Sequence, residues 1–171
     1  MSHITIDKDT KVGEEEIELA ATLFYHPTNG YKQEEINLCV LGEPTAQKRH
    51  RHVSKGGFTR TYDPSAADKG DFLSIVQKNA PEKPYDCPLH LDLKFYFTRP
   101  KGHFKTGKNS HILKDTAPKW HTGRNDVDNL FKFVADSLNK IYWKDDGTIC
   151  SSTITKEYSD NPRTEITIRP L

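Results

Sequence analysis

The sequence predicts an α+β fold in which two main helices pack on a small mixed sheet, and three patterns support this. Residues 89–97 are apolar at every odd position, as in a strand with one buried face. Residues 126–141 place apolar side chains every three or four positions, as in an amphipathic helix. The elements follow in the order strand, helix, strand, long loop, helix, strand, strand, and 171 residues suffice for one such core.

The predicted domain begins with a strand. Residues 36–41 alternate apolar with small or polar side chains, and Gly42-Glu43-Pro44 ends the pattern. A basic stretch follows as far as Thr61, and we expect it to be a loop.

A helix is predicted next. Asp63 suits its N-cap and Pro64 its first turn, because proline has no N–H to lose at that position. The apolar pattern continues through residues 72–76, and Pro81 and Pro84 end the helix.

The second half combines a long loop, the clearest helix and two strands. The loop runs over residues 100–123, and Asp145-Asp146-Gly147 predicts a turn after the helix. Residues 148–158 and 164–168 are expected to pair as an antiparallel hairpin. The helix should bury one apolar face, made of Val127, Leu130, Phe131, Val134, Leu138 and Ile141.

Charge and composition narrow the class of protein. Residues 1–35 carry a net charge of −5 and the remaining residues +6, so we expect an acidic N-terminal extension (1–35) before a basic domain (36–171) with a polyanionic partner. No apolar run suggests a membrane span or a signal segment. Cys39, Cys87 and Cys150 form no CxxC pair, which argues against zinc or disulfides. Cys39 and Cys150 lie in strand patterns and are expected to be buried.

Acidic residues flank the second helix. Asp126 and Asp128 lie at its start, and Asp145-Asp146 follow its end. Carboxylates that converge repel each other unless a cation lies among them, and oxygen ligands favour Mg²⁺ or Mn²⁺. Such a site supports phosphodiester hydrolysis. The alternative is structural, with Asp126 as an N-cap, Asp128 as a first-turn charge and Asp145-Asp146-Gly147 as a plain turn.

Two stretches of this sequence resemble the RusA family of Holliday-junction resolvases. Residues 124–132, RNDVDNLFK, are followed thirteen residues after the lysine by Asp145-Asp146 and a strand pattern. Residues 40–51, VLGEPTAQKRHR, resemble the strand, Gly-x-Pro and basic loop with which that family begins. Arg124-Asn125 replaces a frequent Lys-Pro of the family, and His50 replaces a frequent proline, but no acidic position is altered.

The resemblance implies a RusA-like fold, a homodimer and a magnesium-dependent endonuclease that cuts four-way DNA junctions in recombination and repair. By position, Asp126, Asp128 and Asp146 would be the catalytic, metal-binding carboxylates and Asp145 a supporting fourth. The resemblance also implies that Lys132 is a catalytic or phosphate-contacting lysine. Its position fits that role, because it lies one helical turn from Asp128 and can reach a phosphate oxygen. Its alternative role is a surface ion pair.

Two basic stretches, residues 43–61 and 99–124, would hold the DNA backbone. Phe58, Phe104 and Trp120 are interleaved with these charges. Phe104 or Trp120 could stack on or wedge between bases. The alternative is that the aromatic side chains cover the core, and this role is favoured for Trp120. The residues expected to contact DNA are Lys48, Arg49, Arg51, Lys101, Lys105, Lys119 and Arg124.

Two other functions remain open on the sequence. A nucleotide-sugar transferase can use a DxD motif to hold Mn²⁺, although no nucleotide-binding half is visible here. A DNA-binding module without enzymatic activity would use its acids structurally. The junction nuclease would act in the cytoplasm, associated with the nucleoid, and a phage or prophage gene is a natural source for it.

Overall fold

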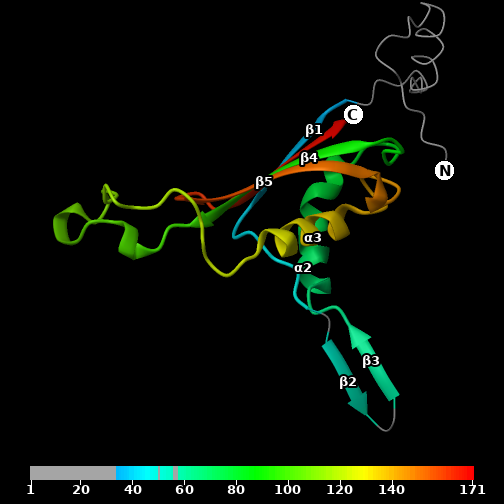
Figure 1. Cartoon of the computed structure of the whole chain (residues 1–171), viewed down its shortest axis with the longest axis horizontal. Helices are drawn as coiled ribbons and strands as arrows, with labels where there is room; N and C mark the ends of the chain where they lie inside the picture. The colour runs from blue at the N-terminus through cyan, green and yellow to red at the C-terminus, as the bar shows by residue number, and fades with distance from the viewer. Residues whose placement is uncertain (1–33, 50, 56–57) are drawn as a thin grey trace, which may run out of the picture. The chain divides into compact units, whose positions relative to one another are not determined.

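The computed structural model describes residues 34–49, 51–55 and 58–171, which belong to one compact unit spanning residues 33–171. The predicted acidic extension therefore lies outside the described residues except for Glu34 and Glu35. A four-stranded mixed sheet forms the centre of this unit (Figure 1). Its strands in spatial order are β1 (Ile36–Leu41), β6 (Arg163–Pro170), β4 (Leu89–Thr98) and β5 (Ile149–Ser159).

The mixed character of the sheet comes from its last pair. β1 with β6 and β6 with β4 are antiparallel, whereas β4 and β5 are parallel. Two helices, α2 (Ala66–Val76) and α3 (Val127–Leu138), accompany the sheet, so the predicted α+β class is confirmed. Short 3-10 turns occupy the connections: η1 (Gln77–Asn79), η2 (Lys101–His103), η3 (Gly107–Asn109) and η4 (Asp146–Thr148).

The core lies between one sheet face and the helices. All five odd positions of β4 are buried, as the alternation predicted, and Leu89, Leu91 and Leu93 are fully buried. Phe72 of α2 meets Phe133 of α3 edge to face, with ring centroids 5.5 Å apart. Because α2 and α3 pack against each other in this core, the start of α3 has a fixed position on the helix-covered face of the sheet.

The predicted helices differ from the observed ones at their ends. α2 begins at Ala66 with Ser65 as its N-cap, whereas the sequence suggested Asp63. The Asp63 carboxylate instead accepts the Ser65 N–H at 2.8 Å, forming a turn that delays the helix. α3 ends at Leu138, so Ile141 lies beyond it, and Val127 on its first turn is exposed.

The predicted β5–β6 hairpin is wrong, because β4 lies between the two strands. β4 is buried on its whole inner face and needs a neighbour on each side. The chain leaves β4, forms α3 and returns in β5 parallel to β4, as a crossover connection through a helix allows. β6 then occupies the other side of β4, between it and β1.

The basic stretch predicted as a loop contains a hairpin. β2 (Arg51–Lys55) and β3 (Phe58–Tyr62) pair antiparallel in a separate two-stranded sheet (Figure 1). The sequence did carry a signal for it, since Gly56-Gly57 between two β-prone runs is typical of a tight hairpin turn.

Two further expectations about single side chains are wrong. Cys39 and Cys150 do lie in strands, but both are exposed. Cys39 alternates with buried Leu38 and Val40 along β1 and therefore lies on the solvent face of the sheet. Trp120 is 52% exposed instead of covering the core. Among the described residues, no helix is long and apolar enough to cross a membrane.

Candidate functional site

The first acidic pair lies on the opening turn of α3. Asp126 is the N-cap residue, and its backbone oxygen accepts the Leu130 N–H at 3.0 Å, but its side chain caps nothing. Asp128 lies in the first turn, and both side chains are exposed. No hydrogen bond or ion pair joins either carboxylate to another described residue. Both carboxylates therefore present free oxygen atoms to solvent, where a cation can bind them.

Lys132 lies on the same exposed stripe of α3. Its ammonium group is 3.3 Å from Asp136, one turn further along, so Lys132 pairs with Asp136 and not with Asp128. Asp136 in turn contacts Lys69 of α2 at 3.0 Å. This chain of contacts positions Lys132 while leaving its side chain 56% exposed and able to contact a bound anion.

Lys69 is the centre of an ion network between α2 and α3. It also contacts Asp63 at 3.0 Å, and Gln47 donates to the same carboxylate at 2.9 Å. Partial burial alone would raise the pKa of Asp63, but the hydrogen bonds from Ser65, Lys69 and Gln47 lower it to about 2. Partial burial would lower the pKa of Lys69, and its two carboxylate partners more than offset this and raise it.

The second acidic pair lies beyond the other end of α3, at η4. One carboxylate oxygen of Asp145 accepts the Gly147 N–H at 3.0 Å, and the other is 3.2 Å from the Lys140 ammonium group. These two interactions hold the pKa of Asp145 below its ordinary value. Asp145 is therefore partly engaged within its own turn, whereas Asp146 is exposed at the start of η4.

The two acidic pairs lie at opposite ends of α3. The twelve residues of this helix span about 18 Å at the ordinary rise of 1.5 Å per residue. The start of α3 is tied to the far part of β5, because Lys156 donates to the backbone oxygen of Asn125, whereas η4 leads directly into Ile149 at the beginning of β5. Accordingly, no group of three or more His, Cys, Asp or Glu side chains suited to a metal ion occurs within residues that the structure describes.

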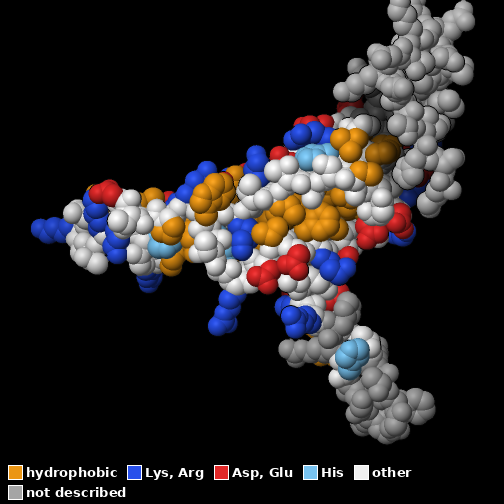
Figure 2. Space-filling model, in the orientation of Figure 1, with side chains coloured by type: hydrophobic (Ala, Val, Ile, Leu, Met, Phe, Trp, Pro, Cys, Tyr) orange, Lys and Arg blue, Asp and Glu red, His pale blue; other side chains and the backbone are white. Residues whose placement is uncertain are grey.

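The basic residues predicted to contact DNA are mostly exposed. Lys101 and Lys105 lie on the segment after β4, which extends to the left in Figure 2 and whose charged side chains are mostly Lys and Arg. Lys48 contacts Asp68 at 2.6 Å, and Arg49 is exposed beside it. Arg51 opens β2, and its side chain lies outside the described residues.

The remaining basic residues lie next to the start of α3. Lys119 is 3.3 Å from Glu157 and lies over the Trp120 ring, 4.6 Å from its centroid. Arg124 is exposed two residues before Asp126. His121 stacks on Phe97, with ring centroids 4.0 Å apart, and anchors this part of the chain to the sheet. The residues around His121 in the sequence do not predict its contact with Phe97. Lys69 was also missed, because its partners Asp63 and Asp136 meet only in the folded protein.

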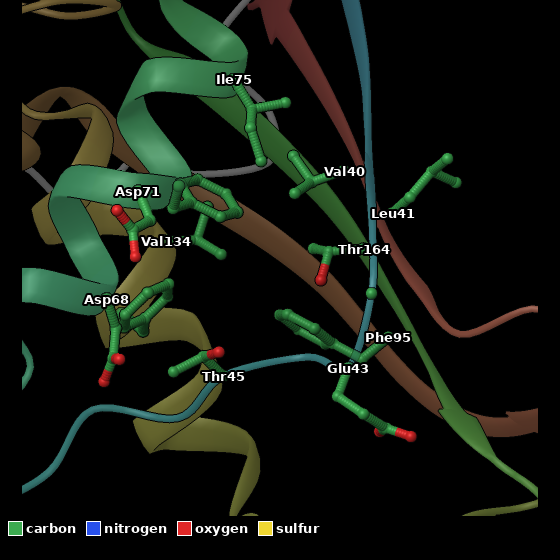
Figure 3. Close-up of a pocket in the computed structure, with 13 residues that line it drawn as sticks. Val40, Leu41, Glu43, Thr45, Asp68, Asp71, Ile75, Phe95, Val134 and Thr164 are labelled. Carbon is green, nitrogen blue, oxygen red and sulfur yellow. The ribbon is translucent and has the colours of Figure 1, made fainter.

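A pocket of about 190 Å³ lies elsewhere, between β1, α2 and α3. Figure 3 shows its apolar wall, which includes Val40 and Phe95, and the acidic side chains Asp68 and Asp71 at its edge. None of the four aspartates at the ends of α3 lines this pocket. The acidic pairs are instead surface features, which suits a large substrate that approaches from outside.

Two comparisons with known proteins bear on this site. The family model described as Endodeoxyribonuclease RusA matches residues 42–169. A curated protein of Bacillus subtilis (strain 168), described as Uncharacterized protein YqaN, is 34% identical over 141 residues, which cover 80% of this chain and 96% of that protein. The family match includes both acidic pairs, Lys132 and the basic segment after β4.

Proposed function

Because this chain belongs to the RusA family of endodeoxyribonucleases, we propose that it resolves four-way DNA junctions by paired, symmetric, magnesium-dependent cuts. Membership of the family implies a Holliday-junction-resolving nuclease that binds branched DNA and generally requires a divalent metal ion. The proposal rests chiefly on the exposed carboxylates of Asp126 and Asp128, which have no partner among the described residues. They lie on the same helix as Lys132 and follow a basic segment in the chain. Such an enzyme would work in the cytoplasm, on chromosomal or phage DNA.

The chemical type of the acidic side chains suits a hard cation such as Mg²⁺. Carboxylate oxygens are the ligands that Mg²⁺ prefers, and Asp126 and Asp128 lack protein partners among the described residues. We assign the metal site to Asp126, Asp128 and Asp146, with Asp145 in support, and Mn²⁺ would substitute for Mg²⁺. The bound ion would neutralise charge on the scissile phosphate and activate water.

The other side chains hold the substrate. Lys132, positioned by Asp136, is placed to contact a phosphate oxygen near the carboxylates. Lys119 and Arg124 lie next to the start of α3, and Lys101 and Lys105 lie on the segment after β4 that extends away from the sheet (Figure 1). All four side chains would bind the DNA backbone. Their positive charge counters the repulsion between the aspartates and the phosphates.

A homodimer accounts for the distance between the acidic pairs. Within the described residues, Asp126 and Asp128 lie at the start of the approximately 18 Å helix and Asp145 and Asp146 lie beyond its other end, and no three acidic side chains gather in one place. Two copies related by a two-fold axis can bring Asp126 and Asp128 of one next to Asp146 of the other, twice over. A four-way junction has the same approximate symmetry and needs two matched cuts, which a dimer with two such sites would make.

The experiment that tests the function is cleavage of a labelled four-way junction and of a linear duplex with the same sequences, with and without Mg²⁺. We expect metal-dependent cutting of the junction only. Asp126→Asn, Asp128→Asn and Asp146→Asn should each abolish cleavage and preserve binding, and Asp145→Asn should be milder. Metal-independent binding without any cutting would favour a non-enzymatic DNA-binding module, and full activity of Asp126→Asn would overturn the metal assignment.

Mixing two inactive variants tests whether the site is shared between copies. If Asp126 and Asp146 act across the dimer, a heterodimer of Asp126→Asn with Asp146→Asn contains one doubly altered site and one intact site. It should therefore nick one strand of the junction, although each parent is inactive. If both residues act within one chain, every site in the mixture carries one substitution and no nicking returns.

A further inference from the structure

β1 has an unpaired outer edge. It pairs with β6 on one side, and no strand lies on its other side among the described residues. The Gly42 N–H donates to the Pro162 oxygen at 2.9 Å, which continues the pairing with β6. Because successive residues direct their backbone groups to alternate sides, Val40 also faces β6 with its backbone, whereas Cys39 and Leu41 direct their N–H and C=O groups outward. β1 contains no charged residue and no proline, the usual devices that protect an edge from another strand.

The pocket between β1, α2 and α3 lies beside this edge. Its apolar wall is made of Val40, Phe72, Phe95, Phe133 and Val134. Ile75 of α2 also lines it and is 51% exposed, so the apolar surface continues to solvent (Figure 3). The volume of about 190 Å³ is smaller than that of usual small-molecule sites, which are about 300–1,000 Å³. The pocket therefore suits one or two side chains of a larger partner.

Three carboxylates, of Glu43, Asp68 and Asp71, border this apolar pocket, and no described Lys, Arg or His side chain lines it. Figure 3 shows the two aspartates on α2 and Glu43 on the chain that continues β1. Asp68 contacts Lys48, and Glu43 accepts the Thr98 N–H at 3.1 Å. No hydrogen bond or ion pair joins the Asp71 carboxylate to another described residue. This border attracts cationic side chains and repels DNA phosphates.

We propose that an extended basic peptide segment of another protein docks here, adding a strand to β1 and placing one apolar side chain in the pocket. An added strand gains affinity from main-chain hydrogen bonds, here to Cys39 and Leu41, and specificity from alternate side chains. The peptide residue opposite Val40 points to the same face of the sheet as Val40, into the pocket. Basic residues two positions before and after it point to the same face, where the carboxylates lie. The proposal does not depend on nuclease activity.

Binding of designed peptides to the full-length chain tests the proposal. The probe is a dye-labelled peptide of sequence TRTLTRT, which reads the same in both directions, so either strand orientation places leucine between two arginines on one face. Fluorescence anisotropy should show saturable binding. TRTSTRT lacks the apolar side chain and TETLTET reverses the charge, and each should bind at least about tenfold more weakly. Binding of TRTLTRT that is absent, or no tighter than that of either control peptide, would overturn the proposal.

Reversing one charge on α2 should exchange the preference. Asp71→Lys places a cation beside the pocket, so it should weaken binding of TRTLTRT about tenfold and strengthen binding of TETLTET. Asp115→Lys makes the same change of charge at an exposed residue of the long loop after β4 and should leave both affinities unchanged. Equal effects of the two variants would show that only the net charge of the chain matters, which would contradict a docking site at the pocket.

Exchange of backbone amides with D₂O tests whether the peptide adds as a strand. In the free protein the outward N–H groups of Cys39 and Leu41 should exchange rapidly, and saturating TRTLTRT should protect them. Protection already present in the free protein would mean that a second copy or another part of the chain occupies this edge. No protection at saturation would mean that the peptide does not pair with β1. Either result would refute the proposal.

A proline on the edge gives a second measure of strand pairing. Cys39→Pro removes an outward N–H that β6 does not use, a position where an edge strand tolerates proline. It should weaken binding of TRTLTRT about fivefold or more, whereas Cys39→Ser keeps the N–H and should bind as the wild type does. A folded Cys39→Pro with wild-type affinity would rule out main-chain pairing at this position, and with it the proposed strand.

Discussion

Replacing Asp63 with asparagine should make the stability of the protein less dependent on acid pH. The pKa of Asp63 falls from its ordinary value of 3.8 to about 2 in the fold, through its bonds to Ser65, Lys69 and Gln47. A tenfold change in acid dissociation corresponds to about 1.36 kcal/mol, so the full effect is about 2.4 kcal/mol. The Asp63 side chain is 22% exposed and partly screened by solvent, so we expect about 1–2 kcal/mol.

The sign follows from the lowered pKa. A carboxyl group that is more acidic in the folded state stabilises the fold above about pH 4, and this stabilisation is lost as pH falls from 3.8 toward 2. Urea unfolding of the wild type and Asp63→Asn should therefore differ by about 1–2 kcal/mol at pH 7 and converge near pH 2. Asp71→Asn, an exposed carboxylate of α2, serves as the control. A constant difference between wild type and Asp63→Asn across this range would refute the reasoning.

Three other changes probe the DNA surface, the ion network and the extension. Replacing Lys48, Arg49 and Arg51 together with alanine should weaken junction binding, measured by fluorescence anisotropy. The slope of log binding constant against log salt concentration should become flatter by about 0.9 for each phosphate contact that is lost. Lys69→Met should release Asp136 from its contact with α2 and so misplace Lys132. The single-turnover cleavage rate should fall roughly 10- to 100-fold while junction affinity changes little. Lys69→Arg should retain most of the wild-type rate. Deleting residues 1–33 should leave a folded core with unchanged melting temperature and cleavage, and a truncated protein that fails to fold would show that the extension packs on the domain.

Local patterns in the sequence predicted most of the elements. The alternation along Leu89–Phe97 identified β4 and its buried face, because side chains of a strand alternate whatever the rest of the chain does. The apolar spacing after Asp126 identified α3 for the same kind of reason. The sequence also carried a signal for the β2–β3 hairpin, since a Gly-Gly pair between two β-prone runs is typical of hairpins, but the run of charge around it favoured a loop.

Contacts between residues that are distant in sequence could not be predicted and became visible only in the folded structure. β5 and β6 follow each other along the chain with turn residues between them, and only the need of buried β4 for two neighbours separates them in the sheet. The network of Asp63, Lys69 and Asp136 forms because packing of Phe72 against Phe133 brings α2 and α3 together.

The same division holds for the candidate site. The positions of the acidic residues on either side of one helix could be predicted from the sequence, because motif and spacing are properties of the local chain. Only the folded structure showed that Asp126 and Asp128 have no partner among the described residues and that Asp145 is engaged with Lys140. A rigid helix of about 18 Å keeps its two ends apart, so whether the acidic pairs meet depends on contacts that no stretch of one chain encodes locally.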